Sequence, residues 1–115
     1  MERIKKYQAI LIKLLQESVQ PFLLEPHSEV EEQLILDTQR HYFQWLTIGW
    51  EDDEVFKSYI NVHFVIKPSG KIWLMENNTE IRFAEELVKR GVPRQDIVLG
   101  FQPPSVRAYT DYAVA

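Results

Sequence analysis

Alternation of apolar and polar residues over positions 55–67 is the longest regular pattern in the chain, and it predicts a β-strand. Even-numbered positions such as Val62 and Phe64 fall on one side of an extended backbone, and odd-numbered positions fall on the other. Residues 68–70, Pro-Ser-Gly, then supply turn chemistry, because proline presets φ and glycine accepts a positive φ. The alternation resumes over residues 71–77, so we predict a long antiparallel hairpin.

Two segments before this hairpin extend it into a sheet. Leu34 and Leu36 alternate with their neighbours and predict a first strand. The next segment, residues 41–49, is apolar on both faces, which favours a central strand or one whose second face is covered by another chain. Gly49 before Trp50 indicates a β-bulge. Because the connections are short, we predict a meander of four antiparallel strands near residues 30–37, 41–49, 55–67 and 71–77.

Apolar residues at three- and four-residue spacing predict two helices. The first covers residues 2–20 and ends before Pro21. Its apolar positions include Ile4, Tyr7, Leu11, Leu14 and Leu15. The second covers residues 80–90, with acidic residues in its first half and Gly91 as a stop signal. We expect both helices to cover one face of the sheet, giving an α+β fold in a single domain of residues 1–115.

The segments after the second helix are also apolar. Residues 97–99 predict either a one-turn helix capped by Asp96 or a short strand. The tail, residues 101–115, carries too much apolar surface to stay in water, so it should dock on the domain or on a partner.

The alternation also predicts a protein-binding face on the side of the sheet away from the helices. If the even-numbered positions face the helices, the opposite side gathers aromatic and methionine residues, together with Trp45 or Phe43, and such residues are enriched in interface cores. The predicted partner-binding residues are Tyr59, His63, Trp73, Met75, Tyr109 and Tyr112. Two alternatives are that the tail covers this face within the same chain, and that two copies associate through it.

Composition narrows the range of functions. The 115 residues carry a net charge of −4 and no cysteine, so disulfide and thiolate chemistry are excluded. An acidic protein is a poor candidate for binding duplex DNA alone, since phosphate contacts need a basic face. The chain has neither a long apolar run nor a secretory signal, which leads us to expect a cytoplasmic protein without a membrane span.

Few residues suggest catalysis or metal binding. His27, His41 and His63 lack metal-ligand spacing, and no phosphate loop or nucleophile motif occurs. Asp37 could orient His41, but a surface pair is the simpler interpretation. Four acidic residues at 51–54 could hold a cation, yet they lack the spaced ligands of calcium loops, so a solvated hairpin tip is preferred. We predict no catalytic, cofactor-binding or metal-binding residues.

Several motifs resemble those of the XisI-like family. They are Asp-Thr-Gln-Arg at 37–40, Ile-Gly-Trp at 48–50, Gly-Lys-Ile-Trp at 70–73, Gly-Val-Pro at 91–93, Asp-Ile-Val-Leu-Gly-Phe at 96–101 and the ending Ala-Val-Ala at 113–115. The likeness covers nearly the whole chain. Members of that family are named fdxN element excision controlling factors, after a cyanobacterial DNA element removed from the genome by site-specific recombination.

The resemblance implies an accessory, non-enzymatic role, because the recombinase is a separate protein. Family members are typically encoded beside XisH-like proteins, which look like nuclease-fold chains, so an XisH-like protein is the candidate partner. The resemblance supplies no catalytic residues. Where the family commonly places a histidine after Leu-Gly-Phe, this chain has Gln102, which argues against an essential imidazole there.

Two other functions stay open at this point. A direct nucleic-acid binder would use a basic patch near the second helix. Contact with DNA could also be weak or indirect. The residues of that patch would be Lys89, Arg90, Arg94 and Arg107. A small hydrolase centred on His63 or His41 would require at least a pocket with convergent polar groups.

Overall fold

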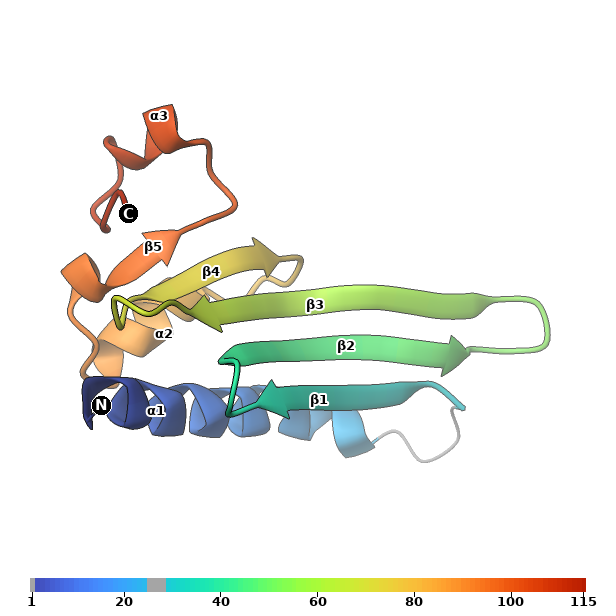
Figure 1. Ribbon diagram of the computed structural model, residues 1–115. Coiled ribbons are helices and arrows are strands. Elements are labelled where there is room, and N and C mark those ends of the chain that lie inside the picture. The colour runs from blue at the N-terminus through green and yellow to red at the C-terminus, as the bar shows by residue number, and fades with distance from the viewer. Residues whose placement is uncertain (1, 25–28) are drawn as a thin grey trace.

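The computed structural model describes residues 2–24 and 29–115, in which one five-stranded sheet is covered by helices on one face (Figure 1). In chain order the elements are α1 (Glu2–Val19), η1 (Gln20–Leu24), β1 (Glu31–Asp37), β2 (Tyr42–Trp50), β3 (Phe56–Ile66), β4 (Ile72–Asn77), α2 (Phe83–Lys89), η2 (Arg94–Asp96), β5 (Ile97–Leu99) and α3 (Pro104–Arg107). Both predicted helices and all four predicted strands are confirmed, although α2 begins later than expected.

The sheet has a fifth strand, so the prediction of four antiparallel strands is wrong in number and in orientation. Strands β1 to β4 form the expected antiparallel meander, whereas β5 pairs with β4 in parallel, with Ile72 opposite Ile97. A parallel neighbour requires a crossover that returns the chain to the same end of the sheet, and α2 with η2 supplies it. Of the two structures left open for residues 97–99, the strand is the one observed.

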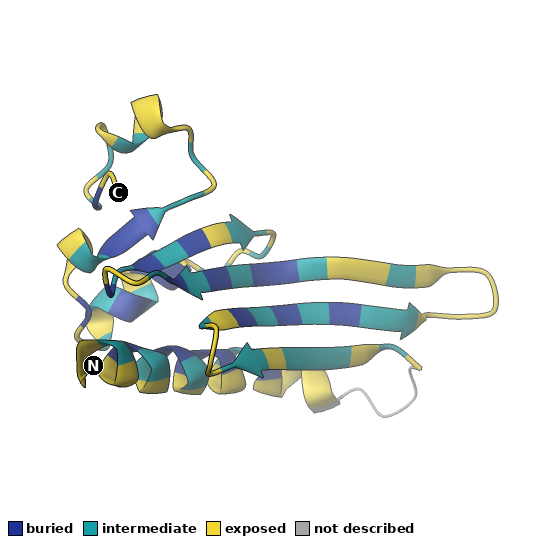
Figure 2. Ribbon diagram, in the orientation of Figure 1, coloured by how far each residue is buried: buried dark blue, intermediate teal, exposed yellow. Residues whose placement is uncertain are grey.

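The core lies between the helices and one face of the sheet (Figure 2). Helix α1 buries Tyr7, Leu11, Leu14, Leu15 and Val19. From α2, Phe83 packs edge-to-face on Phe64 of β3, with ring centroids 5.6 Å apart. The predicted arrangement of both helices on one face is therefore confirmed.

A β-bulge in β3 reverses the predicted orientation of its first half. Trp45 pairs with Val62 but Leu46 pairs with Ile60, so Asn61 is an extra residue in β3. One extra residue moves every side chain beyond it to the other face. Phe56, which the alternation places on the helix side, is consequently 50% exposed on the opposite face. Tyr59, predicted to face away from the helices, instead lies on the helix side, opposite Thr47.

The bulge expected at Gly49 is not there, because the pairing of β2 with β3 continues in register through Trp50. The glycine serves a close approach instead. A Cβ at Gly49, whose φ is +137°, would lie 2.3 Å from the carbonyl oxygen of Glu29. A glycine here therefore lets the chain that enters β1 pass directly against β2.

The C-terminal tail docks on its own chain at the β5 edge of the sheet (Figure 1). Ala113 forms a parallel bridge with Val98. Two cations contact the ring of Trp73 in β4: Lys67 Nζ lies 3.7 Å and Arg107 Cζ 4.9 Å from its centroid. The expected docking of the tail is thus confirmed. No helix within residues 2–24 and 29–115 is long and apolar enough to cross a membrane.

Candidate functional site

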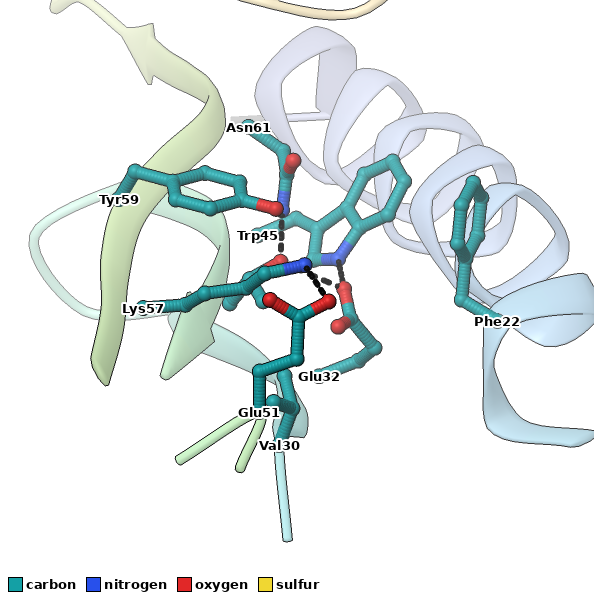
Figure 3. A pocket seen from close by; sticks show the side chains of 9 residues that line it. Phe22, Val30, Glu32, Trp45, Glu51, Lys57, Tyr59 and Asn61 are labelled. Carbon is teal, nitrogen blue, oxygen red and sulfur yellow. Dashed lines mark hydrogen bonds and ion pairs between the residues drawn. The ribbon is translucent and has the colours of Figure 1, made fainter. Parts of the chain in front are cut away.

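A cavity of about 310 Å³ opens on the helix side of the sheet, where β2 and β3 extend past the end of α1 (Figures 1 and 3). The helix cannot cover this part of the sheet because it ends at Val19 and continues only as the short η1. The lining residues are Phe22, Val30, Glu32, Trp45, Thr47, Glu51, Lys57, Tyr59 and Asn61.

Polar side chains on the cavity wall form one hydrogen-bonded network. The Asn61 amide nitrogen donates to the Thr47 hydroxyl at 2.8 Å, and this hydroxyl donates to Glu32 Oε1 at 2.8 Å. The Trp45 indole N–H donates to the same Glu32 oxygen, also at 2.8 Å. Thr47 and Asn61 are only 4% and 9% exposed, so the network supplies the partners that buried polar groups need. It also fixes the orientation of the Glu32 carboxylate.

The rim of the cavity combines aromatic rings with an ion pair. Phe22 packs against Trp45 at a centroid distance of 5.2 Å, and Tyr59 lies half-exposed on the opposite strand (Figure 3). Lys57 Nζ lies 3.3 Å from Glu51 Oε1. The cavity thus offers apolar rings and two carboxylates to an incoming group.

A second candidate surface is the uncovered face of β1 to β3, on the side away from α1 and α2 (Figure 2). Large apolar side chains stay half-exposed there, and Trp50 contacts Phe56 at 5.2 Å between ring centroids. We call this surface the open face; its apolar members are Ile35, Tyr42, Leu46, Ile48, Trp50, Phe56 and Ile60. Contiguous exposed apolar surface of this kind commonly marks a protein–protein contact.

The predicted partner-binding residues do not form one surface. Tyr59 lines the cavity, and Trp73 lies beneath Arg107 of the tail, with its indole N–H lacking a hydrogen-bond partner among the described residues. Met75, 36% exposed, borders Gly100. Their role in partner binding stays a prediction.

The two predicted tail tyrosines also separate. Tyr109 is 90% exposed, whereas Tyr112 packs against the core and accepts a hydrogen bond from Arg94 at 3.2 Å. The tail therefore covers the β5 edge without using Tyr109.

His63 lies beside the open face in a partly buried position. The Gln44 side-chain amide is 3.2 Å from its Nδ1. Burial lowers the pKa of His63 below its ordinary value of 6.5, and the nearby Glu76 carboxylate opposes this shift. The imidazole is therefore neutral at physiological pH.

Each of the four predicted nucleic-acid contacts already has a partner in the chain. Lys89 Nζ is 3.3 Å from Glu86, and Arg90 donates to Glu17 at 2.6 Å. Arg94 bonds Tyr112, and Arg107 stacks on Trp73 while donating to the Gln102 carbonyl at 3.0 Å. Lys89 and Arg90 belong to the second helix and its end, whereas Arg107 belongs to the tail.

The remaining histidine and acidic candidates do not converge. The Asp37 carboxylate accepts the backbone N–H groups of Gln39 and Arg40, while the His41 ring contacts Gln8 at 3.1 Å, so Asp37 does not orient His41. Neither His41 nor His63 lines the cavity. Within the described residues, no group of three metal-ligating side chains could hold an ion. His27 lies outside those residues.

Sequence reasoning did not find Glu32, Thr47 and Asn61 as a site. Glu32 belongs to a charge run that usually marks solvent or a sheet edge, and Asn61 reaches the cavity only through the bulge. A signal did exist, because Thr47 and Asn61 are polar residues each flanked on both sides by large apolar residues.

Comparison with known proteins agrees with the resemblance in the motifs. The family model described as XisI protein matches residues 1–114. A crystal structure of a XisI-like protein from Anabaena variabilis ATCC 29413 is 47% identical, with a TM-score of 0.88, over 97% of this chain and 99% of that one. A crystal structure of fdxN element excision controlling factor XisI from the same organism is 30% identical, with a TM-score of 0.82, over 98% of this chain and 99% of that one. No curated protein is significantly similar to the chain.

Proposed function

Because this chain belongs to the XisI family, we propose that it is a non-enzymatic accessory protein that helps to control the excision of a DNA element by site-specific recombination. The name of the relative with 30% identity, an excision controlling factor, supports a regulatory role. The protein would act in the cytoplasm through a nuclease-fold partner of the XisH-like class.

The open face is the observation that carries this proposal. Ile35, Tyr42, Trp50 and Phe56 each keep about half of their surface in water, which is unfavourable for large apolar side chains. Aromatic residues at the centre of an interface commonly carry much of its binding energy. A protein partner would remove these side chains from water, whereas DNA would not match them.

The cavity chemistry also favours binding over catalysis. Its buried hydroxyl and amide nitrogen are engaged with one another and with Glu32. The described histidines lie outside it, so none of their imidazoles can act as a general base at the cavity wall. We therefore assign no catalytic residues.

Co-purification from the native host tests the proposed partner. A tagged copy of the chain should recover an XisH-like protein under conditions that keep complexes intact. Recovery of the tagged chain without any XisH-like protein would contradict the proposal.

A salt titration with the purified chain separates this function from direct nucleic-acid binding. We expect no appreciable affinity for duplex DNA at moderate salt, because the net charge is −4 and two of the four cations, Lys89 and Arg90, are already paired with carboxylates. Affinity that falls steeply as salt rises would instead indicate phosphate contacts.

A further inference from the structure

The carboxylates of Glu32 and Glu51 and the side-chain amide of Asn61 line the cavity at the end of the sheet (Figure 3). Glu32 receives both of its hydrogen bonds at Oε1, so none from the described residues reaches Oε2. Asn61, 9% exposed, donates through its amide nitrogen, and its side-chain oxygen receives no hydrogen bond from those residues. These two oxygens, which receive no hydrogen bond from the described residues, are acceptors and suit a ligand rich in N–H donors.

The chain already places a cation at this position. Lys57 extends from β3 across the cavity and its ammonium lies 3.3 Å from the Glu51 carboxylate (Figure 3). Glu51 is half-exposed and Lys57 about one-third exposed, and exposed ion pairs of this kind contribute little stability. Another cation can therefore replace Lys57 at small cost.

The aromatic rim selects among cations. Phe22 and Tyr59 are both half-exposed and flank the polar wall. A guanidinium is planar, stacks on aromatic rings, donates two parallel hydrogen bonds to a carboxylate and is less strongly hydrated than an ammonium. A rim of rings around a fixed carboxylate consequently favours arginine over lysine.

Charge around the cavity points to a basic partner. The start of β1 and the loop between β2 and β3 lie at the same end of the sheet (Figure 1). These two segments, residues 29–32 and 51–57, contain seven acidic residues and only one basic residue, Lys57. The acidic residues are Glu29, Glu31, Glu32, Glu51, Asp52, Asp53 and Glu54. Such a concentration attracts a positively charged protein surface and orients its approach.

We propose that this cavity binds the guanidinium group of an arginine side chain presented by a protein partner, with Glu32 as its main acceptor. Glu32 is preorganised for this role because Trp45 and Thr47 hold its carboxylate in place. The inference rests on the proposed function and deepens it, since it assigns the chemistry of a partner contact on the side of the sheet opposite the open face.

A titration of the isolated protein tests the cavity directly. The Trp45 indole N–H bonds to Glu32, so its resonance in a nitrogen–proton NMR spectrum reports on the carboxylate. N-acetylarginine amide should shift this resonance saturably, whereas the neutral isostere N-acetylcitrulline amide should not. An equal response to both probes, or none to the arginine probe, overturns the proposal.

Two variants with a matched control sharpen the test. Glu32→Gln keeps an oxygen that can accept from Trp45 and Thr47 but loses the charge, so the arginine response should disappear. Lys57→Met removes the competing ammonium and should strengthen arginine binding severalfold. Lys13→Met, an exposed lysine of α1, changes the net charge equally and should leave binding unchanged. Unaltered binding in Lys57→Met, or the same gain in Lys13→Met, would contradict the assignment.

The outcomes separate this inference from the proposed function. If an XisH-like protein co-purifies but the isolated chain gives no arginine response, the cavity assignment alone is wrong. If the arginine response is present but no XisH-like protein co-purifies, the proposed function fails and the cavity is retained as a guanidinium site.

Discussion

Tyr7 and Arg3 connect the start of α1 to two other segments of the chain, η2 and the β3–β4 turn. From α1, Tyr7 donates a hydrogen bond to the carboxylate of Asp96, the last residue of η2. Burial, together with this hydrogen bond, raises the pKa of Tyr7 to about 12. Arg3 also reaches Asp96, at 4.0 Å, and donates to the Ser69 carbonyl. The start of α1 is thereby held against both the β3–β4 turn and the entry to β5.

Replacing Tyr7 by Phe should lower the free energy of unfolding by about 1.5–3 kcal/mol, because Asp96 loses a donor while remaining mostly buried. Urea denaturation of the variant measures this loss. Tyr109→Phe is the control, since that side chain is 90% exposed, and it should leave stability unchanged. Equal effects of the two substitutions would show that the Tyr7 hydrogen bond contributes nothing.

His63 should make stability depend on pH. Its pKa in the folded state lies below 6.5 because burial disfavours the charged ring. As pH falls from above 6.5, the unfolded chain takes up the proton first, so the free energy of unfolding decreases until pH reaches the folded-state pKa. In His63→Gln this part of the pH dependence should vanish in denaturation curves measured on both sides of 6.5. An identical slope in the variant would refute the assignment.

At the scale of elements, periodicity in the sequence located both helices and the first four strands, but not the bulge in β3. No residue type marks Asn61 as an extra position, because the bulge follows from pairing with β2 and not from local preference. The same extra residue moves Tyr59 into the cavity, so the site was not predictable from strict alternation. Three residues at 97–99 were too few to distinguish strand from helix without the neighbouring β4.

Gly49 and Gly91 provide a matched pair of substitutions that tests whether the segment before β1 needs a glycine in β2 in order to pack against that strand. Both have positive φ, but a Cβ at Gly91 meets nothing within 4 Å, whereas one at Gly49 meets the backbone of residues 29–30. Gly91→Ala should cost only backbone strain, about 1–3 kcal/mol. Gly49→Ala should cost clearly more in thermal or urea unfolding. Similar costs would mean that the entry to β1 moves aside freely.

Trp73 should hold the tail more than it supports the core. It is only partly buried and stacks with Lys67 and Arg107. In Trp73→Ala, amide exchange should accelerate at Ala113, whose N–H bonds to the Ile97 carbonyl, while exchange in the middle of α1 stays slow. Uniform acceleration across the protein would instead place Trp73 among the residues on which the whole fold depends.

For the whole molecule, the two faces of the sheet differ in how far the helices cover them. One face is closed by α1 and α2, and the other stays apolar yet open over β1 to β3. The two-sided apolar pattern of residues 41–49 anticipated this, because β2 is both a central strand and a strand with a half-exposed second face. Acidic residues gather at one end of the same strands, beside the cavity.

The affinity of the proposed XisH-like partner for open-face variants tests the central claim most directly. Ile35→Ser combined with Phe56→Ser removes apolar surface from the open face, and Val106→Ser removes similar chemistry from α3. Circular dichroism first confirms that the variants fold. The double variant should then bind more weakly, with a dissociation constant at least about tenfold higher, equivalent to about 1.4 kcal/mol of binding free energy. Val106→Ser should change the dissociation constant little. Wild-type affinity in the double variant would contradict the account.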